Sequence, residues 1–154
     1  IEGYGSCEWG FADLILTTSD GSGVEANEEI RIYLESITFG AVSNAAIVAR
    51  NGGKAFLYGD ITITGNCQNF FSAFRNGEIY SFADSITLSG TRAFTTFANA
   101  ELASFIHCDS TITGSATGTR YSVTGNSVIN TYGAGATYFP GNVAGTTATG
   151  GQYL

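Results

Sequence analysis

Five acidic residues recur at intervals of 22 to 25 residues: Asp13, Glu35, Asp60, Asp84 and Asp109. Two carboxylates about 5–5.5 Å or 6.5–9.5 Å apart can hydrolyse a glycosidic bond. If the chain stacks on itself with this period, the catalytic candidates are Asp60, Asp84 and Asp109. Acids at one corner of a repeat also serve as turn residues, because Asp hydrogen-bonds nearby backbone N–H groups. The turn role is the preferred interpretation, and cleavage stays an alternative.

An aromatic ring stands two residues before most of these acids. The position holds Phe11, Tyr33, Tyr58 and Phe82, and the fifth repeat has His107 there with Phe105 nearby. Rings stacked on a flat sheet can form an apolar interface between subunits or bind the C–H faces of sugars. A register slip of one residue would turn them into the core. We prefer the subunit interface among these three interpretations.

An asparagine stands near the start of each repeat, at Asn27, Asn51, Asn76 and Asn99. Stacked amides can satisfy one another, because each both donates and accepts hydrogen bonds, so we expect a structural Asn ladder. No nucleophilic catalytic motif accompanies the only histidine, His107. The three cysteines, Cys7, Cys67 and Cys108, have no CxxC spacing and are expected to be buried or half-buried thiols. The sequence predicts neither a metal site nor a cofactor.

The stretches that carry these residues indicate strands rather than helices. Residues 25–36, 49–60, 74–85 and 97–110 alternate with period two and are rich in Ile, Phe, Tyr and Val. Their small aliphatic residues, such as Ile32, Leu57 and Ile79, should point inward. Two or three short strands in each repeat of 22–25 residues, without helices, predict one coil of an all-β parallel β-helix. Residues 1–114 should form about four to five such coils.

The composition excludes several classes of partner. The chain has 154 residues, a formal net charge of −7 and only 12% charged residues, which argues against nucleic acid and anionic membrane surfaces. No apolar run is long enough for membrane insertion. The absence of a starting Met indicates a fragment or a processed product. A surface rich in Thr, Ser, Asn and Gly is typical of extracellular or virion proteins.

The composition changes in residues 115–154, where Arg120 is the only charged residue and Gly, Ala and Thr dominate. Isolated aromatic residues occur there, including Tyr138, Phe139 and Tyr153. A flexible low-complexity tail is one interpretation. We prefer an ordered cap or a segment that intertwines subunits, because uncharged chain with aromatic residues needs burial or a partner.

The repeat over residues 11–114 and the ending GYFPG-like TYFPGN…GGQYL resemble the C-terminal part of bacteriophage tail-fibre or tailspike proteins. The resemblance implies a right-handed parallel β-helix with a C-terminal capping or trimerisation segment. It also implies a homotrimer, located on the virion tail or otherwise extracellular, that binds host-surface polysaccharide. Some members of this family cleave the glycan, but this chain is shorter than their usual catalytic helices. A polysaccharide depolymerase and a purely structural extracellular filament module are the alternatives.

Overall fold

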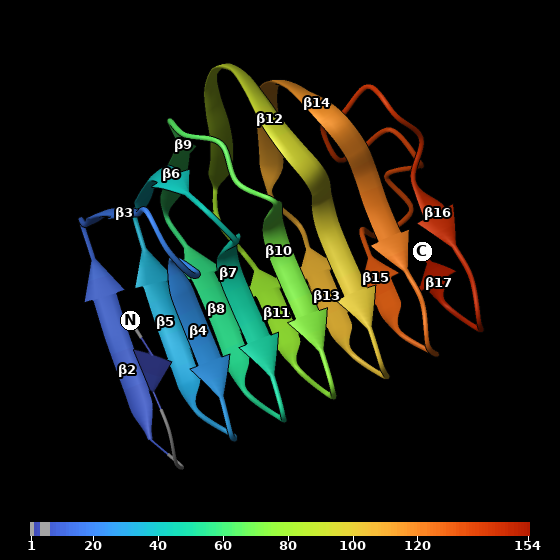
Figure 1. Cartoon of the computed structure of the whole chain (residues 1–154), viewed down its shortest axis with the longest axis horizontal. Helices are drawn as coiled ribbons and strands as arrows, with labels where there is room; N and C mark the ends of the chain where they lie inside the picture. The colour runs from blue at the N-terminus through green and yellow to red at the C-terminus, as the bar shows by residue number, and fades with distance from the viewer. Residues whose placement is uncertain (1, 4–6) are drawn as a thin grey trace.

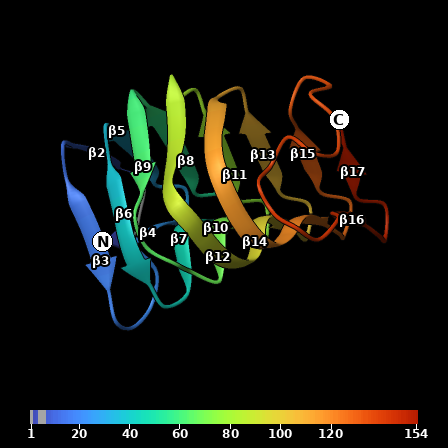
Figure 2. The same ribbon diagram turned by 90° about the horizontal axis from the view of Figure 1, so that it is seen from above.

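The chain winds into an all-β parallel β-helix of about 6 turns. The structure is a computed structural model that describes residues 2–3 and 7–154. Figure 1 shows the turns stacked from the N-terminal to the C-terminal end, and Figure 2 shows the same stack from above. The strands are β1 (Glu2–Gly3), β2 (Glu8–Ala12), β3 (Ile15–Thr18), β4 (Val24–Asn27), β5 (Arg31–Glu35), β6 (Thr38–Val42), β7 (Ala45–Arg50), β8 (Lys54–Tyr58), β9 (Asp60–Ile63), β10 (Asn69–Phe74), β11 (Glu78–Ser81), β12 (Ser85–Glu101), β13 (Phe105–Cys108), β14 (Thr111–Val123), β15 (Val128–Asn130), β16 (Thr146–Thr147) and β17 (Gln152–Tyr153).

Equivalent strands of successive turns pair in parallel and form the faces of the helix. The first strands make a seven-stranded sheet in the order β17-β15-β13-β11-β8-β5-β2. The other strands form a ten-stranded sheet, in which β3, β6 and β9 lie on one side of β12 and β10, β7, β4 and β1 lie on the other. Strand β12 is long enough, at 17 residues, to run through both parts. Irregular pairing with β14 after Thr87 and Ala93 marks where β12 bends.

The pairing register stacks like side chains inside the helix. Ile32 pairs with Ala55, Ala55 with Ile79, and Ile79 with Ile106, which pairs in turn with Ile129. All five side chains are fully buried. Because side chains alternate along a strand, their neighbours point outward. The predicted division into an inward aliphatic side and an outward side is therefore confirmed for these strands.

A row of phenylalanines fills the interior. The ring centroids of Phe39 and Phe70 lie 5.6 Å apart, those of Phe70 and Phe97 5.1 Å, and those of Phe97 and Phe139 5.4 Å. Phe139 comes from the loop between β15 and β16 and is fully buried. The prediction of four to five turns was too low, because residues 115–154 carry the stacking on through β14 to β17. Burial of rings such as Phe139 explains why this stretch needs few charges.

One corner of the helix is a tight turn that repeats in every coil. Two consecutive residues there have positive φ, for example Arg75 (52°) with Asn76 (60°) and Leu102 (56°) with Ala103 (59°). In the third coil the N–H of Gly77 donates to the carbonyl of Phe74 across the turn at 3.1 Å. This is the geometry of a type I′ turn, which favours Gly and Asn because they tolerate the left-handed region.

The predicted ladder of four asparagines is wrong, because the residues occupy different positions. Asn51 donates its side-chain N–H to Asn27 at 2.7 Å, so these two do form one rung. Asn76 lies in the corner turn, whereas Asn99 lies in β12 and pairs with Ser72. The extra residues of β12 lengthen the fourth coil, so equal spacing in the sequence does not give equal height in the stack.

The corner turn predicts opposite effects for two substitutions. Leu102→Asn places a residue that tolerates positive φ where an exposed leucine now stands, and Asn76→Leu does the reverse. We expect Leu102→Asn to stabilise the fold by about 1 kcal/mol and Asn76→Leu to destabilise it by about the same amount. Urea unfolding followed by circular dichroism measures both, and a loss of stability in both variants would contradict the prediction.

The thiols differ more than the sequence indicated. Cys7 is exposed, so the expectation that it is buried or half-buried was wrong; Cys67 is half-buried and Cys108 is buried. Burial raises the pKa of the Cys67 thiol to about 12, and burial also raises the pKa of Cys108. Since the thiolate is the reactive form, only Cys7 should react readily in the folded protein.

A thiol titration tests this order of reactivity. With a chromogenic disulfide reagent at pH 8, we expect one thiol to react within minutes in the native protein and all three to react in denaturant. The variant Cys7→Ser should remove the fast phase. Rapid reaction of a second thiol in native Cys7→Ser would show that Cys67 or Cys108 is more accessible than its burial implies.

Candidate functional site

The outward side of β5, β8, β11 and β13 carries an aromatic face. We define it by its members: Tyr33, Phe56, Tyr58, Tyr80, Phe82, Phe105 and His107. Its longer ladder runs from Tyr33 to Phe56, with ring centroids 5.0 Å apart, and from Phe56 to Tyr80 at 5.1 Å. A shorter ladder joins Tyr58 and Phe82 at 6.0 Å. Parallel pairing between turns builds both ladders, because each ring meets the ring one turn later.

The sequence expectation of a single column aligned on the acids is corrected by the register. Tyr33 pairs with Phe56, and Tyr58 pairs with Glu35, so Tyr33 and Tyr58 belong to different ladders. The spacing of the acids is therefore not the spacing of stacked positions. Phe56 and Tyr80 complete the longer ladder and were missed as members of the column. Their signal was present, since both follow period two on the outward side of their strands.

Phe11 is a second correction. It pairs with Leu34, which is fully buried, and packs partly buried against the hydrophobic core. Because partners in register point to the same side of a sheet, Phe11 faces the interior and does not belong to the aromatic face. The one-residue register slip considered for the whole column thus applies to the first turn alone.

The rings of the longer ladder cover each other's faces. The planes of Tyr33 and Phe56 are inclined by 12°, and those of Phe56 and Tyr80 by 8°. Their edges therefore form a strip at the surface, which widens at Tyr58 and Phe82, with 39% and 43% of their surface exposed. Sugars pack their C–H groups on ring faces, whereas a strip of ring edges suits a flat apolar contact with another protein surface.

Charged pairs border the aromatic face and fix the ionisation of its neighbours. Lys54 Nζ lies 2.6 Å from Glu78 Oε2, and the Tyr80 hydroxyl donates to the same oxygen at 2.6 Å. Burial alone would raise the pKa of Glu78, but the hydrogen bonds from Lys54 and Tyr80 outweigh it and lower the pKa. Burial, reinforced by the Glu78 carboxylate, raises the pKa of Tyr80 to about 12. The pair is therefore ionised and the phenol neutral near pH 7.

His107 continues the longer ladder, but other rings cover it. Its side chain is 5% exposed, with the ring of Phe82 at 5.2 Å and that of Tyr132 edge-on at 4.9 Å. Its Nε2 is buried without a hydrogen-bond partner among the described residues. Burial lowers the pKa of His107, opposed in part by the nearby Asp109 carboxylate. His107 therefore serves as a neutral ring in the aromatic packing.

The acids proposed for catalysis lie at the corner after the first face. Ser85 is the Cα partner of Asp60, and its hydroxyl donates to Asp60 Oδ1 at 2.7 Å. The backbone N–H of Asp84 donates to the carbonyl of Gly59, and that of Asp109 to the carbonyl of Ser81. These contacts fit turn residues. The described residues contain no group of three or more His, Cys, Asp or Glu side chains placed to hold a metal ion.

Comparisons with known proteins give no relative for this chain. No family model matches it, and neither a curated protein nor a solved structure matches it. The described residues also contain no helix long and apolar enough to cross a bilayer. The fold therefore rests on the structure of the chain itself, and the function must be argued from its surfaces.

The buried His107 predicts a pH dependence of stability. Because its pKa is lower in the folded state, the unfolded chain binds the proton first, and stability falls as the pH drops below about 6.5. We expect the melting temperature of His107→Phe, which keeps a ring at this position, to fall less between pH 7 and pH 5. Thermal unfolding at several pH values measures the two slopes, with Tyr132→Phe as the control that retains the histidine. Equal slopes for the wild type and His107→Phe would contradict the assignment.

Proposed function

We propose that this chain is a β-helical element of a bacteriophage tail fibre or tailspike that recognises host-surface polysaccharide as a homotrimer. The observation that carries the proposal is the aromatic face on a parallel β-helix with few charges. A long β-helix holds a rigid surface far from its base, which suits an extracellular or virion-borne fibre. The resemblance of the repeat and of the ending to such proteins supports the same role.

The occupant proposed for the aromatic face is a second copy of the chain. Exposed ring edges at Tyr58 and Phe82 give a flat apolar strip, and burying such a strip is favourable at about 25 cal/mol per Å². The bordering charges have both signs, with Lys54 beside Glu78 and Arg31 beside Glu8. Another copy offers the same mixture of rings and opposite charges, so the rim can be complementary when copies associate.

The mass of the protein in solution tests assembly. We expect light scattering to give three chain masses for the wild type and one for Phe82→Asp, because a carboxylate in the apolar contact would be buried without a partner. The matched control is Thr87→Asp, which adds the same charge at an exposed position of β12. Circular dichroism checks that the variants keep the fold.

Two outcomes would overturn the proposed assembly. One is a monomeric wild type at tens of micromolar chain concentration. The other is a Phe82→Asp protein that keeps the wild-type mass. Loss of the trimer in Thr87→Asp as well as in Phe82→Asp would move the interface from the aromatic face to another side of the helix.

A further inference from the structure

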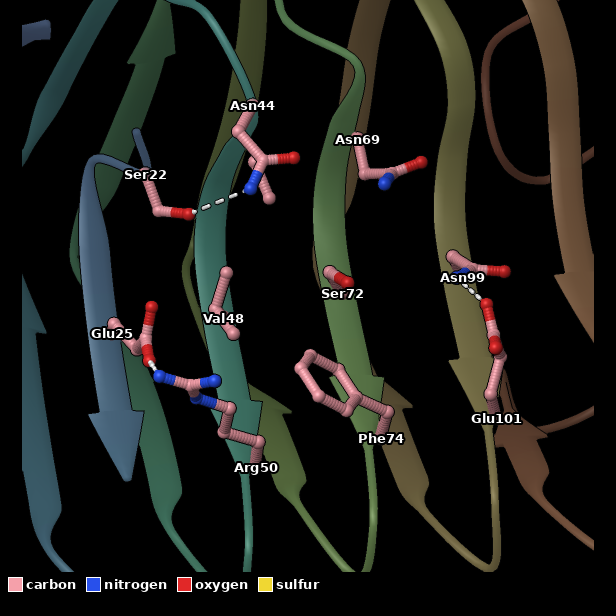
Figure 3. A pocket seen from close by; sticks show the side chains of 11 residues that line it. Ser22, Glu25, Asn44, Val48, Arg50, Asn69, Ser72, Phe74, Asn99 and Glu101 are labelled. Carbon is pink, nitrogen blue, oxygen red and sulfur yellow. Dashed lines mark hydrogen bonds and ion pairs between the residues drawn. The ribbon is translucent and has the colours of Figure 1, made fainter. Parts of the chain in front are cut away.

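A polar groove lies on the outer side of β4, β7, β10 and β12, on a different side of the helix from the aromatic face (Figure 3). Its volume is about 330 Å³. Three amides line it, from Asn44, Asn69 and Asn99, and the carboxylates of Glu25 and Glu101 flank Arg50 and Phe74. None of the proposed roles of the aromatic face uses this groove.

The register explains how the groove forms. Glu25 pairs with Val48, Val48 with Ser72, and Ser72 with Asn99, so one row crosses all four strands. The small side chains of Val48 and Ser72 stand between longer ones at the two ends, which leaves a hollow. Three strand spacings make the groove about 14 Å long. This length suits a short oligomer lying along the helix axis.

Most groups in the groove are held rigidly. Glu25 is 9% exposed and ion-paired with Arg50, whose guanidinium lies over the ring of Phe74, 5.9 Å from its centroid. The Asn99 amide donates to Glu101 at 2.6 Å. A groove whose side chains are already ordered loses little entropy when a ligand binds.

Some hydrogen-bonding groups in the groove remain without a partner. Nε of Arg50 is buried and has no hydrogen-bond partner among the described residues. Figure 3 draws no hydrogen bond from the Ser72 hydroxyl to the other lining residues. Unsatisfied groups of this kind cost free energy, which a ligand with its own donors and acceptors can recover.

The chemistry of the lining selects the ligand class. Amides both donate and accept, carboxylates accept, and Phe74 offers half-buried apolar surface, so the groove matches hydroxyl groups and C–H patches together. Among the described residues no ion pair neutralises Glu101, because its only contact is Asn99. An acidic sugar would be repelled there. We infer that the groove binds a neutral oligosaccharide, an inference that rests on the proposed function.

The spacing of the carboxylates favours binding without cleavage. The backbones of Glu25 and Glu101 are three strands apart, about 14 Å, and Arg50 and Phe74 come from the strands between them. Glycosidases hold their two carboxylates no more than about 9.5 Å apart. The groove therefore retains a glycan rather than hydrolysing it.

Binding to an array of neutral and uronic-acid-containing oligosaccharides tests the inference with the full chain. We expect the wild type to bind neutral members only. Isothermal titration with the best neutral oligosaccharide should show at least tenfold weaker binding per site for Asn99→Ala and Glu101→Lys. The matched control Glu35→Lys makes the same charge change at another exposed position and should bind as the wild type does. Glu101→Lys should also gain acidic members of the array.

The outcomes separate this inference from the proposed function. If neutral glycans bind, but Phe82→Ala and not Asn99→Ala weakens binding per site, glycan recognition stands and the groove is the wrong site. If the wild type binds acidic members only, the ligand class is wrong. If no member binds at all, both the groove and the polysaccharide-recognition role of the proposed function are overturned, whatever the oligomeric state.

Discussion

The structure depends on parallel hydrogen bonding between one turn and the next. Each strand pairs in register with its equivalent in the following turn, as Arg31, Ile32 and Tyr33 of β5 do with Lys54, Ala55 and Phe56 of β8. Successive turns therefore lie one strand spacing, about 4.8 Å, apart. Every side chain is forced to meet the one above it, so the sequence must supply compatible neighbours at each height.

The same constraint produces three different solutions. Inside, aliphatic residues and phenylalanines stack because close contact between apolar groups is favourable. On the aromatic face, rings stack on rings and leave only their edges to the surface. In the polar groove, a cation and its neighbours meet instead: Arg50 lies between Glu25 on one strand and Phe74 on the next. Two outer surfaces with distinct chemistry thus arise from one repeating backbone, and we assign one to assembly and the other to the glycan.

The C-terminal stretch shows how the stacking accommodates uncharged chain. Phe139 is buried against Phe97, and the Tyr138 hydroxyl donates to the carbonyl of Ser110 at 2.6 Å. Tyr121 and Tyr153 stack with centroids 3.8 Å apart. The aromatic residues that looked isolated in the sequence are thus the anchors of the last turns. Their polar ends find partners on the preceding coil, so the stretch stays ordered with one charged residue.

The sequence by itself determined the fold class and the side to which most strand residues point. Period-two alternation is a local property, and residues such as Ile32 and Ile79 carry it without reference to the rest of the chain. It also identified most of the aromatic face, although Phe56 and Tyr80 were visible only as outward positions.

Only the tertiary structure decided which residues share a height in the stack. Turns differ in length, since β12 carries extra residues, so equal spacing in the sequence misaligned Asn99 with Asn76 and Glu35 with Asp60. The polar groove escaped notice for the same reason: Glu25, Arg50 and Glu101 come from separate turns and follow no repeated motif. Register is set by pairing between turns, which the alternation within one strand does not encode.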